Sequence, residues 1–385
     1  MSEPQANDVV VAGGGPAGAL AAWLLARAGA RVTVFERSRF PRPKLCGDTL
    51  NPGAVALLGR YFDLTALAAG ALRIDGMLLS GPGPVFVRGA YGGDLHGLAI
   101  TREILDEWLI RHAVRAGARL EETITVTGPE RGPDGRVRGV RVRRRDGREE
   151  VHRARLTLGA DGRRSRLGEA CGLSSCAARP RRWAIGAYFE GVDALSSMGE
   201  MHVRDGHYIG VAPTPDGRAN ACLVQPFDRR RAWGSPDALL EARLGADPVL
   251  APRFARARRT GPPAVLGPLA IDARVPGCDG LLLLGDAAGF IDPMTGDGIR
   301  LALASAETAA AIAAQVLDGR LPAGSAHRAY AAALRPRVGP KRAFNRAMRE
   351  IVSSPRAVRI AARAAAVWPG AFGAIIRYAG DAGRM

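Results

Sequence analysis

The sequence predicts an α/β fold in which a parallel-sheet unit is interleaved with an antiparallel sheet and followed by C-terminal helices. An apolar strand, a glycine-rich turn and a helix occur in this order near residue 10 and again near residue 285. Between about residues 179 and 267 the pattern changes to short alternating segments, which are typical of antiparallel sheet. At 385 residues the chain exceeds one ordinary core, so we expect more than one domain.

The first element is a short apolar strand over residues 8–12, followed by a turn that matches the pattern G-x-G-x-x-G. Gly13 permits the tight turn, Gly15 lets the backbone approach a pyrophosphate, and Gly18 lets the helix pack closely on the strand. The helix that starts near Pro16 offers unpaired N–H groups and its positive dipole end to phosphates. These features predict a Rossmann-type dinucleotide-binding unit.

The second strand, residues 31–36, ends at Glu36, which follows Gly13 by 23 residues. A carboxylate at this position accepts hydrogen bonds from ribose hydroxyls and disfavours a 2′-phosphate. It fits the adenosine ribose of FAD or NAD. We therefore count Glu36, the adjacent Arg37 and Ala17 in the turn as candidate cofactor-binding residues.

Two further segments in the first third of the chain predict local structure. Residues 41–53 contain too much Pro and Gly for a helix or a central strand, so we expect a long loop, which is either functional or a surface linker. Residues 102–116 have the apolar spacing of a helix that Thr101 could cap. Arg102 would stand at its start, where an isolated arginine is more often a solvated charge than a ligand.

A hairpin is expected around Asp146 and Gly147, and its second strand runs into the sequence Gly-Ala-Asp-Gly at residues 159–162. This places Asp161 at the carboxyl end of a strand. Ligands bind at that edge of open α/β sheets.

The α/β pattern returns with a buried strand over residues 281–284, which leads into Gly285 and Asp286. A second glycine-rich stretch, residues 292–298, precedes an alanine-rich helix from Ile299 to about Leu317. Two turns of this kind from distant parts of the chain predict one extended ligand held by both. A dinucleotide with a long middle section fits, whereas NAD alone needs only one such turn.

The composition limits the class of protein. Hydrophobic residues make up 47% and charged residues 24%, which excludes a mainly disordered chain, and 5% aromatics argue against a stacking platform for single-stranded nucleic acid. The net charge of +17 comes almost entirely from arginine, since Lys44 and Lys341 are the only lysines. A coding bias toward arginine explains this better than a nucleic-acid partner, and we expect none. Anionic substrates or membrane surfaces would still be attracted.

The five cysteines are scattered and odd in number, so neither a disulfide framework nor a zinc or other metal site is expected. A reducing cytoplasm suits them. Residues 1–8 carry no apolar signal core, and charges such as Arg27, Glu307 and Arg363 interrupt every apolar stretch of helical length. We therefore expect a cytoplasmic protein without a transmembrane span, with membrane association possible only at its surface.

Taken together, three motifs resemble the FAD-dependent oxidoreductases of the para-hydroxybenzoate hydroxylase fold, and most of all the geranylgeranyl reductase family. They are residues 13–18 with Glu36, residues 159–162, and Gly285 and Asp286 with residues 293–298, spread in the family's order over about 290 residues. The stretch from Lys44 to Asp48 is similar to the family's Cys-Gly loop beside the flavin, although related halogenases carry a similar loop. The halogenase motif Trp-x-Trp-x-Ile-Pro is not found.

The resemblance implies roles for individual residues. Asp286 would bind the ribityl chain, Asp161 would lie near the pyrophosphate, and Arg102 would contact the flavin nucleotide. The backbone from Gly296 to Ile299 would meet the pyrimidine edge of the flavin, where a helix N-terminus stabilises the reduced form. Cys46 would lie on the substrate side, as a proton donor or as a packing residue. The cofactor-binding candidates are therefore Gly13, Gly15, Pro16, Ala17, Gly18, Glu36, Arg37, Cys46, Gly47, Arg102, Asp161, Gly285, Asp286, Pro293, Gly296, Gly298 and Ile299, with Cys46 as the catalytic candidate.

The expected organisation has three parts. Residues 1–70, 96–178 and 268–330 would form the FAD-binding domain, residues 71–95 and 179–267 the substrate domain, and residues 331–385 a C-terminal helical region. Within the last part, helix is expected over residues 341–368, with Arg356, Arg359 and Arg363 on one face. Such a helix either packs over the core with a solvated arginine stripe or rests on an anionic membrane.

Three functions remain open. The first is a flavin-dependent reductase of carbon–carbon double bonds in an isoprenoid or other lipid-like substrate. The second is a flavin monooxygenase that hydroxylates an aromatic or polyketide-like substrate. The third is a non-catalytic protein like the prenyl-binding escort proteins. The Cys-Gly loop favours the first. The reductant, NAD(P)H or another electron donor, and the oligomeric state are not indicated by the sequence.

Overall fold

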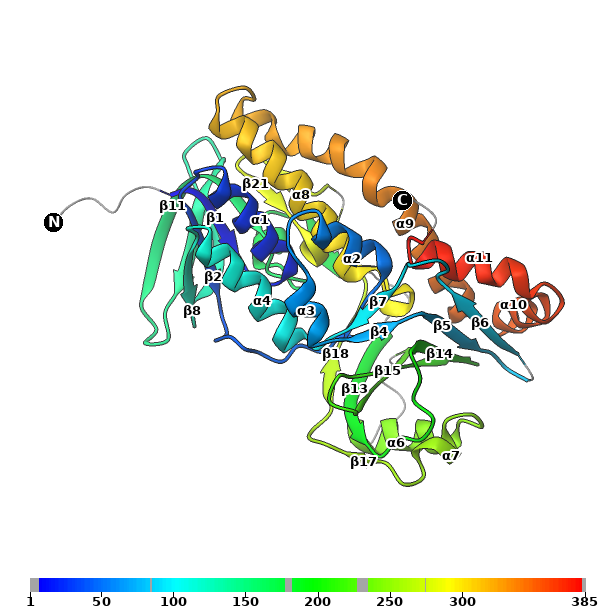
Figure 1. Ribbon diagram of the computed structural model, residues 1–385. Helices are drawn as coiled ribbons and strands as arrows, with labels where there is room; N and C mark the ends of the chain where they lie inside the picture. The colour runs from blue at the N-terminus through cyan, green and yellow to red at the C-terminus, as the bar shows by residue number, and fades with distance from the viewer. Residues whose placement is uncertain (1–6, 84, 177–181, 227–234, 274, 383–385) are drawn as a thin grey trace.

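The computed structural model describes residues 7–83, 85–176, 182–226, 235–273 and 275–382 (Figure 1). The predicted domains also include residues 1–6, 84, 177–181, 227–234, 274 and 383–385, which lie outside the described residues. Two large sheets dominate the structure, one mainly parallel and one mainly antiparallel.

The parallel sheet contains both strands that precede a glycine-rich turn. Its central order is β21-β11-β1-β2-β8, and each neighbouring pair in this run is parallel. The strands are β1 (Asn7–Ala12), β2 (Val32–Glu36), β8 (Arg119–Glu122), β11 (Glu149–Gly159) and β21 (Leu281–Leu283), with β20 (Gly277–Cys278) antiparallel at the edge and β9 (Thr125–Arg131) and β10 (Val137–Arg143) extending β11 as a meander.

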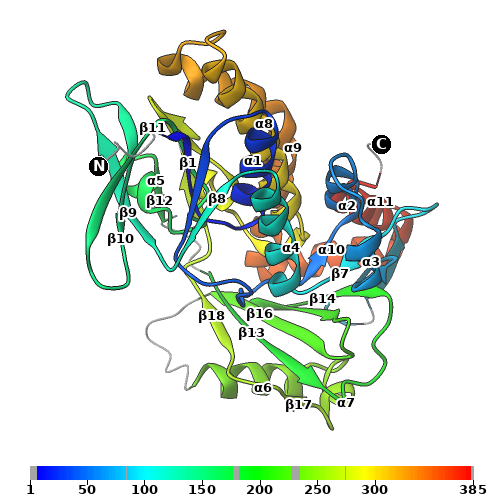
Figure 2. The same ribbon diagram turned by 60° about the vertical axis from the view of Figure 1, so that its left-hand side comes forward.

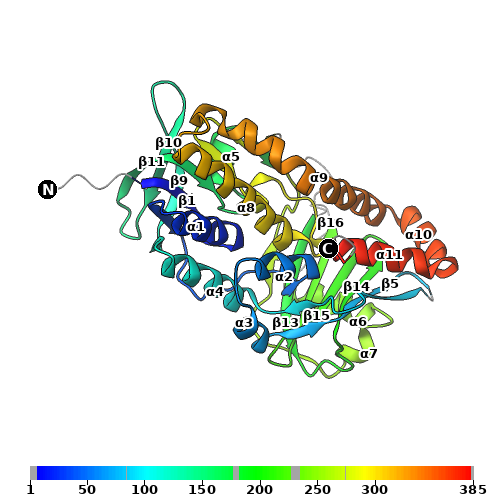
Figure 3. The same cartoon turned by 45° about the horizontal axis from the view of Figure 1, so that its top comes forward.

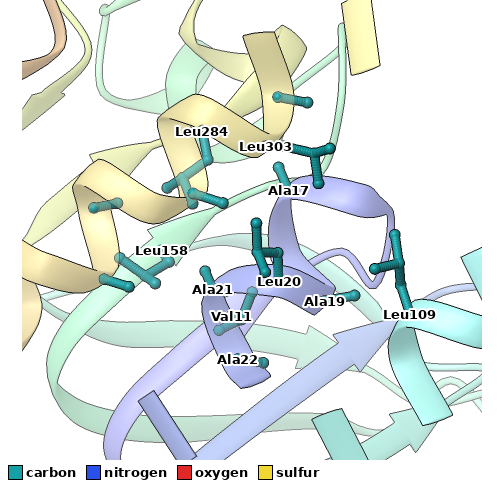
Figure 4. Close-up of a cluster of buried hydrophobic side chains, with 14 of the residues drawn as sticks. Val11, Ala17, Ala19, Leu20, Ala21, Ala22, Leu109, Leu158, Leu284 and Leu303 are labelled. Carbon is teal, nitrogen blue, oxygen red and sulfur yellow. The ribbon is translucent and has the colours of Figure 1, made fainter. Parts of the chain in front are cut away.

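Both faces of this sheet are covered, because alternate side chains of a strand point to opposite faces. Val9 and Val11 of β1 pack with the helices, whereas Val10 and Ala12 pack with β9, β10 and α5 (Arg166–Ala170). Figure 4 shows Leu20 of α1 among Val11, Leu158 and Leu303. The covering helices are α1 (Pro16–Arg27), α4 (Arg102–Arg115) and α8 (Gly298–Leu317).

The antiparallel sheet has the strand order β17-β13-β16-β15-β14-β5-β6, with β18 also paired to β13. Its single parallel pair joins β14 to β5, so a segment from the first hundred residues completes a sheet built mainly after residue 180. One face carries α6 and α7, and the other faces the parallel unit (Figure 2). The elements are β5 (Gly76–Ser80), β6 (Phe86–Ala90), β13 (Arg182–Glu190), β14 (Met198–Arg204), β15 (His207–Pro213), β16 (Ala219–Pro226), β17 (Arg258–Arg259), β18 (Ala264–Leu266), α6 (Pro236–Ala246) and α7 (Ala251–Phe254).

The C-terminal region consists of α9 (Ala326–Ser353), α10 (Pro355–Val367) and α11 (Pro369–Ala379). α9 runs alongside α8, and α11 packs on β6 (Figure 3). Helix therefore begins earlier than the expected residue 341, and it is interrupted near Ser354 and Trp368. These elements confirm the predicted fold class, whereas the exact domain limits stay a prediction.

The segment expected to be one long loop is shorter than predicted. Its end forms β3 (Thr49–Leu50) and the start of α2 (Pro52–Gly59). Asn51 caps α2 by accepting a hydrogen bond from the N–H of Ala54 at 2.9 Å, and Pro52 takes the first helical position, where it costs no hydrogen bond. The remaining short elements are α3 (Thr65–Ala69), β4 (Leu72–Ile74), β7 (Gly97–Ala99), β12 (Ser174–Cys176), β19 (Ile271–Ala273) and the 3₁₀ turns η1 (Gly285–Ala288), η2 (Pro293–Thr295) and η3 (Ala323–Ser325).

Among the described residues, α8 is the one helix that is long and apolar enough to cross a membrane by length and composition alone. Within the structure 67% of its apolar window is buried, and it packs against α1 and α9. α8 is therefore a helix of the core.

Candidate functional site

A large open cavity lies between the carboxyl edge of the parallel sheet and one face of the antiparallel sheet. The two glycine-rich turns both reach it. Residues that were predicted to bind the cofactor and that line this cavity are Gly15, Pro16, Ala17, Cys46, Gly47, Arg102, Gly285, Asp286, Pro293, Gly296, Gly298 and Ile299. Segments 270 residues apart in sequence therefore meet at one site.

The three glycines of the first turn, Gly13, Gly15 and Gly18, have different structural roles. Gly13 has a φ of +97°, and a Cβ there would overlap the carbonyl oxygen of Ala160. A Cβ at Gly18 would overlap the carbonyl oxygen of Gly13, so this glycine lets α1 approach the strand. At Gly15 the nearest atoms to a Cβ are guanidinium nitrogens of Arg42 and Arg102, at 3.7 and 3.9 Å. Gly13 and Gly18 are thus required by packing, whereas Gly15 leaves room for something in the cavity.

Two helix N-termini without side-chain caps face this cavity. α1 starts after Gly15 and α8 after Asp297, and neither has an acidic residue in its first turn. Backbone N–H groups and the positive dipole ends therefore point into one space from two sides. This arrangement fits an elongated dinucleotide whose phosphates lie at α1 and whose electron-rich ring edge lies at α8.

Five predicted residues do not line the cavity. Gly13 and Gly18 act through packing, as described, and Arg37 is exposed elsewhere on the surface. Glu36 is buried and accepts hydrogen bonds from the N–H of Gly14 at 3.0 Å and of Ser38 at 3.1 Å. Its contact with a ribose stays a prediction.

Asp161 stands between two lining residues, Ala160 and Gly162, but its own side chain turns toward α5. One carboxylate oxygen accepts the N–H of Arg166 at 2.8 Å, and the other is buried without a hydrogen bond to a described residue. Burial raises the pKa of Asp161 to about 6. Its proximity to a pyrophosphate stays a prediction.

Arg102 is a buried residue and not a solvated charge. Its guanidinium forms two hydrogen bonds of 2.7 Å with Asp106, one turn along α4. Asp106 also pairs with Arg42 at 3.1 Å, and Arg42 pairs with Glu36 at 3.3 Å. A chain of alternating charges thus joins the end of β2 to the cavity. Thr101 makes no side-chain cap, contrary to expectation.

Cys46 lies in the cavity wall between α4 and the antiparallel sheet. The guanidinium of Arg102 lies near its thiol, and its carbonyl oxygen accepts a hydrogen bond of 2.7 Å from the side-chain amide of Asn220. Burial raises the pKa of Cys46, although the charge of Arg102 opposes the rise. The sulfur therefore carries its proton at neutral pH.

The loop behind Cys46 is fixed by Asp48, which is fully buried at a φ of +49°. Its carboxylate accepts hydrogen bonds from Tyr188 at 2.5 Å and Asn220 at 2.7 Å. Tyr188 and Asn220 belong to β13 and β16, so the antiparallel sheet sets the position of the Cys-Gly loop. Sequence reasoning missed both residues, because nothing local links them to a loop more than 130 residues earlier.

Two cations were also missed. Lys44 and Arg163 line the cavity close to Asp286, and the ammonium of Lys44 lies near Gly162. Lys44 is one of only two lysines in the chain and opens the stretch that resembles the family's Cys-Gly loop, so the sequence did offer an indication of it. With Arg102 they give the cavity a positively charged end suited to phosphate.

The opposite end of the cavity is apolar. Its side chains come mainly from the antiparallel sheet, from β4 and from loops that include the turn before α8. They include Leu45, Ile74, Met77, Met201, Val211, Cys222, Leu266, Leu269, Phe290 and Met294.

The N-terminus of α8 is anchored by a buried charge cluster. Asp297 lies 3.8 Å from the ammonium of Lys341, which also pairs with Asp381 at 3.0 Å just after α11. Arg300 pairs with Asp381 as well. Ala379 and Gly380 line the cavity, so this cluster fastens the C-terminal helix to the site.

Burial raises the pKa of Asp297 to about 7, although Lys341 opposes the shift. Because the folded pKa lies above the ordinary value of 3.8, the folded state binds more protons between pH 4 and 7, and stability falls as pH rises through that range. We expect Asp297→Asn to stabilise the apoprotein at pH 8 by about 2–4 kcal/mol and to change little at pH 4. Urea unfolding at both pH values measures this, with exposed Asp205→Asn as control. An Asp297→Asn profile parallel to wild type would refute it.

Comparisons with known proteins identify the family of this chain. The family model described as "FAD binding domain" matches residues 6–339. Digeranylgeranylglycerophospholipid reductase 2 of Methanopyrus kandleri is 32% identical over 331 residues, which cover 81% of this chain and 78% of that protein. Menaquinone reductase of Mycobacterium tuberculosis is 31% identical over 357 residues, covering 83% and 78%.

Solved structures share the fold. The myxobacterial chondrochloren halogenase, an FAD-dependent halogenase, superposes with a TM-score of 0.80 at 26% identity over 89% of this chain and 82% of that one. A geranylgeranyl bacteriochlorophyll reductase-like protein of Thermoplasma acidophilum gives 0.77 at 23% identity over 92% and 89%. From the family match and these relatives, the chain belongs to the FAD-binding domain family, as an FAD-dependent oxidoreductase most like its geranylgeranyl reductase members.

Proposed function

We propose that this protein reduces carbon–carbon double bonds of an isoprenoid or other lipid-like substrate. The observation that carries the proposal is the division of one cavity into a charged end lined by both glycine turns and an apolar end lined mainly by the antiparallel sheet. The reductase names of the relatives support it. An apolar chain would bury its surface against residues such as Met77, Met201 and Leu266.

Residues of the two glycine turns would hold FAD, with Lys44, Arg102 and Arg163 near its phosphates and the start of α8 near its ring. FAD, when bound and reduced, supplies hydride chemistry at this site. The chain's own contribution is a proton donor. Cys46 keeps its proton at neutral pH and lies between the charged and apolar ends of the cavity, where a substrate carbon would need that proton.

Cys46→Ala is therefore expected to keep bound FAD and to lower kcat by about 100-fold. The measurement is substrate saturation by the isolated holoprotein, with the flavin absorbance checked first. Cys222→Ala is the matched control, since Cys222 also lines the cavity and carries no such role. Full turnover by the flavin-loaded Cys46→Ala variant would leave Cys46 as a packing residue only.

The reaction itself is tested by anaerobic reduction of the holoprotein with NADH, NADPH or a ferredoxin, followed by addition of an unsaturated isoprenoid lipid. We expect reoxidation of the flavin and a product heavier by two hydrogens per reduced bond. Consumption of oxygen with a hydroxylated aromatic product would instead establish the monooxygenase alternative. The same experiment identifies the electron donor that reduces the flavin.

The place of action is part of the proposal. We assign the protein to the cytoplasm, with peripheral contact to a membrane through its basic C-terminal helix. A lipid-like substrate would reside in that membrane. The arginine stripe of α10 supports this contact.

A further inference from the structure

The outward face of α10 combines cations with large apolar side chains. Val358, Ala362 and Ala365 are its buried side chains. On the other side, Ile360 and Val367 are 67% and 68% exposed, and Trp368 at the end of the helix is 66% exposed. The same face carries three exposed arginines. We call Arg356, Arg359, Ile360, Arg363, Val367 and Trp368 the α10 surface.

The spacing of these residues makes one continuous stripe. Positions 356, 359, 360, 363 and 367 follow the three- and four-residue steps of a single helix face. Ile360 therefore lies among the arginines on this face. Exposed large apolar residues surrounded by arginine, with a tryptophan at the end, are typical of helices that lie in the headgroup region of a bilayer.

The charge around this surface has one sign. Residues 351–380 contain four arginines and no aspartate or glutamate. Arg359 pairs with Asp205 at 3.1 Å, and Arg356 and Arg363 form no ion pair within the described part of the chain. Two copies of such a surface would repel each other, so an anionic partner is favoured over a second copy of this protein.

The α10 surface also connects to the site. α10 and α11 pack with β6 around Val87, Ala365 and Ile376, and Met77 of this cluster lines the cavity. α11 ends at Ala379, which is another lining residue. In Figure 1 the two helices (red) form one end of the molecule, opposite the β9–β11 strands. A membrane beneath α10 would therefore lie next to the cavity wall.

We propose that the α10 surface docks the protein on an anionic lipid bilayer, with Ile360, Val367 and Trp368 inserted among the headgroups and the arginines paired with lipid phosphates. The inference deepens the proposed function, because it places the apolar end of the cavity close to a source of lipid. The interactions that would hold the α10 surface on lipid do not depend on which bond the enzyme reduces.

The test is flotation of the purified holoprotein with phosphatidylcholine vesicles that contain phosphatidylglycerol. We expect binding to these vesicles, little binding to phosphatidylcholine alone, and release at high salt. The variant Arg356→Glu, Arg359→Glu, Arg363→Glu should lower the partition coefficient by about tenfold or more. The control is Arg141→Glu, Arg143→Glu, Arg145→Glu, which makes the same charge change at exposed positions in the β10–β11 hairpin and should retain most of the binding.

A second variant keeps every charge and the ion pair with Asp205. Ile360→Ser with Trp368→Ser should also lose binding by about fivefold or more, and the wild-type tryptophan emission should shift to shorter wavelength on vesicles, a shift absent from Trp368→Phe. Equal loss in the hairpin control, or wild-type binding by both α10 variants, would overturn the proposal. So would a dimer that the α10 variants dissociate.

These results are independent of the proposed reaction. Flotation needs no turnover, so vesicle binding by an enzyme inactive on isoprenoids would leave the surface assignment standing. Conversely, the α10 variants should reduce a detergent-dispersed substrate at the wild-type rate if their folding and flavin content are intact.

Discussion

A valine at Gly15 is expected to raise the dissociation constant for FAD about 100-fold while leaving the apoprotein as stable as wild type. A Cβ at Gly15 meets only the ends of two arginine side chains, at 3.7 and 3.9 Å, so the fold accommodates a larger residue. The bulk would then occupy the space through which the pyrophosphate reaches the start of α1. Flavin fluorescence during titration of the apoprotein measures the affinity, and urea unfolding measures the stability.

The neighbouring glycine supplies the contrast. Gly18→Val should destabilise the apoprotein itself, because its side chain would collide with the backbone of Gly13. Gly245→Val is the matched control, since Gly245 is exposed on α6 and a Cβ there meets nothing within 4 Å. Tight FAD binding by Gly15→Val would show that the cofactor does not approach this turn, and the site assignment would fail.

Replacement of Asp292 by alanine is expected to lower the free energy of unfolding by about 3–5 kcal/mol. Asp292 pairs at 3.2 Å with Arg182, whose side chain is 2% exposed. Tyr208 donates a hydrogen bond to the same carboxylate at 2.5 Å. Two other guanidinium nitrogens of Arg182 have no hydrogen bond to a described residue, so loss of Asp292 would leave a buried cation without compensation.

Urea unfolding at pH 7 measures this difference. Asp205→Ala is the control, because it removes an ion pair with Arg359 in which both side chains are about half exposed, and such pairs contribute about 1 kcal/mol or less. The double variant Arg182→Met, Asp292→Leu should recover most of the loss, since both charges are then absent. A cost for Asp292→Ala no greater than that of the control would contradict the assigned role of the pair.

The parts of the fold that are local in sequence could be predicted. Each strand–turn–helix unit carries its own apolar run, glycine spacing and helix start, so β1 with α1 and β21 with α8 were found close to their observed limits. The family and the FAD cofactor followed from those turns, and the comparisons confirm both.

The contacts that complete the site could not be predicted in this way. Asp48 meets Tyr188 and Asn220 only after the antiparallel sheet has formed. The approach of Lys341 to Asp297 likewise depends on how α9 packs along α8. For Asp161, the sequence predicts its position after a strand, but the direction of its side chain depends on the hydrogen bond to α5 and could not be predicted.

The parallel pairing of β5 with β14 joins Gly76 to Met198 within one ladder. A contiguous fragment cut between these positions would leave each piece with an unsatisfied sheet edge and half of a shared core. We therefore expect no linear stretch of this chain to fold autonomously, and limited proteolysis of the native protein should yield nicked but still associated halves. Circular permutation, which preserves both partners, is the engineering route that this topology tolerates.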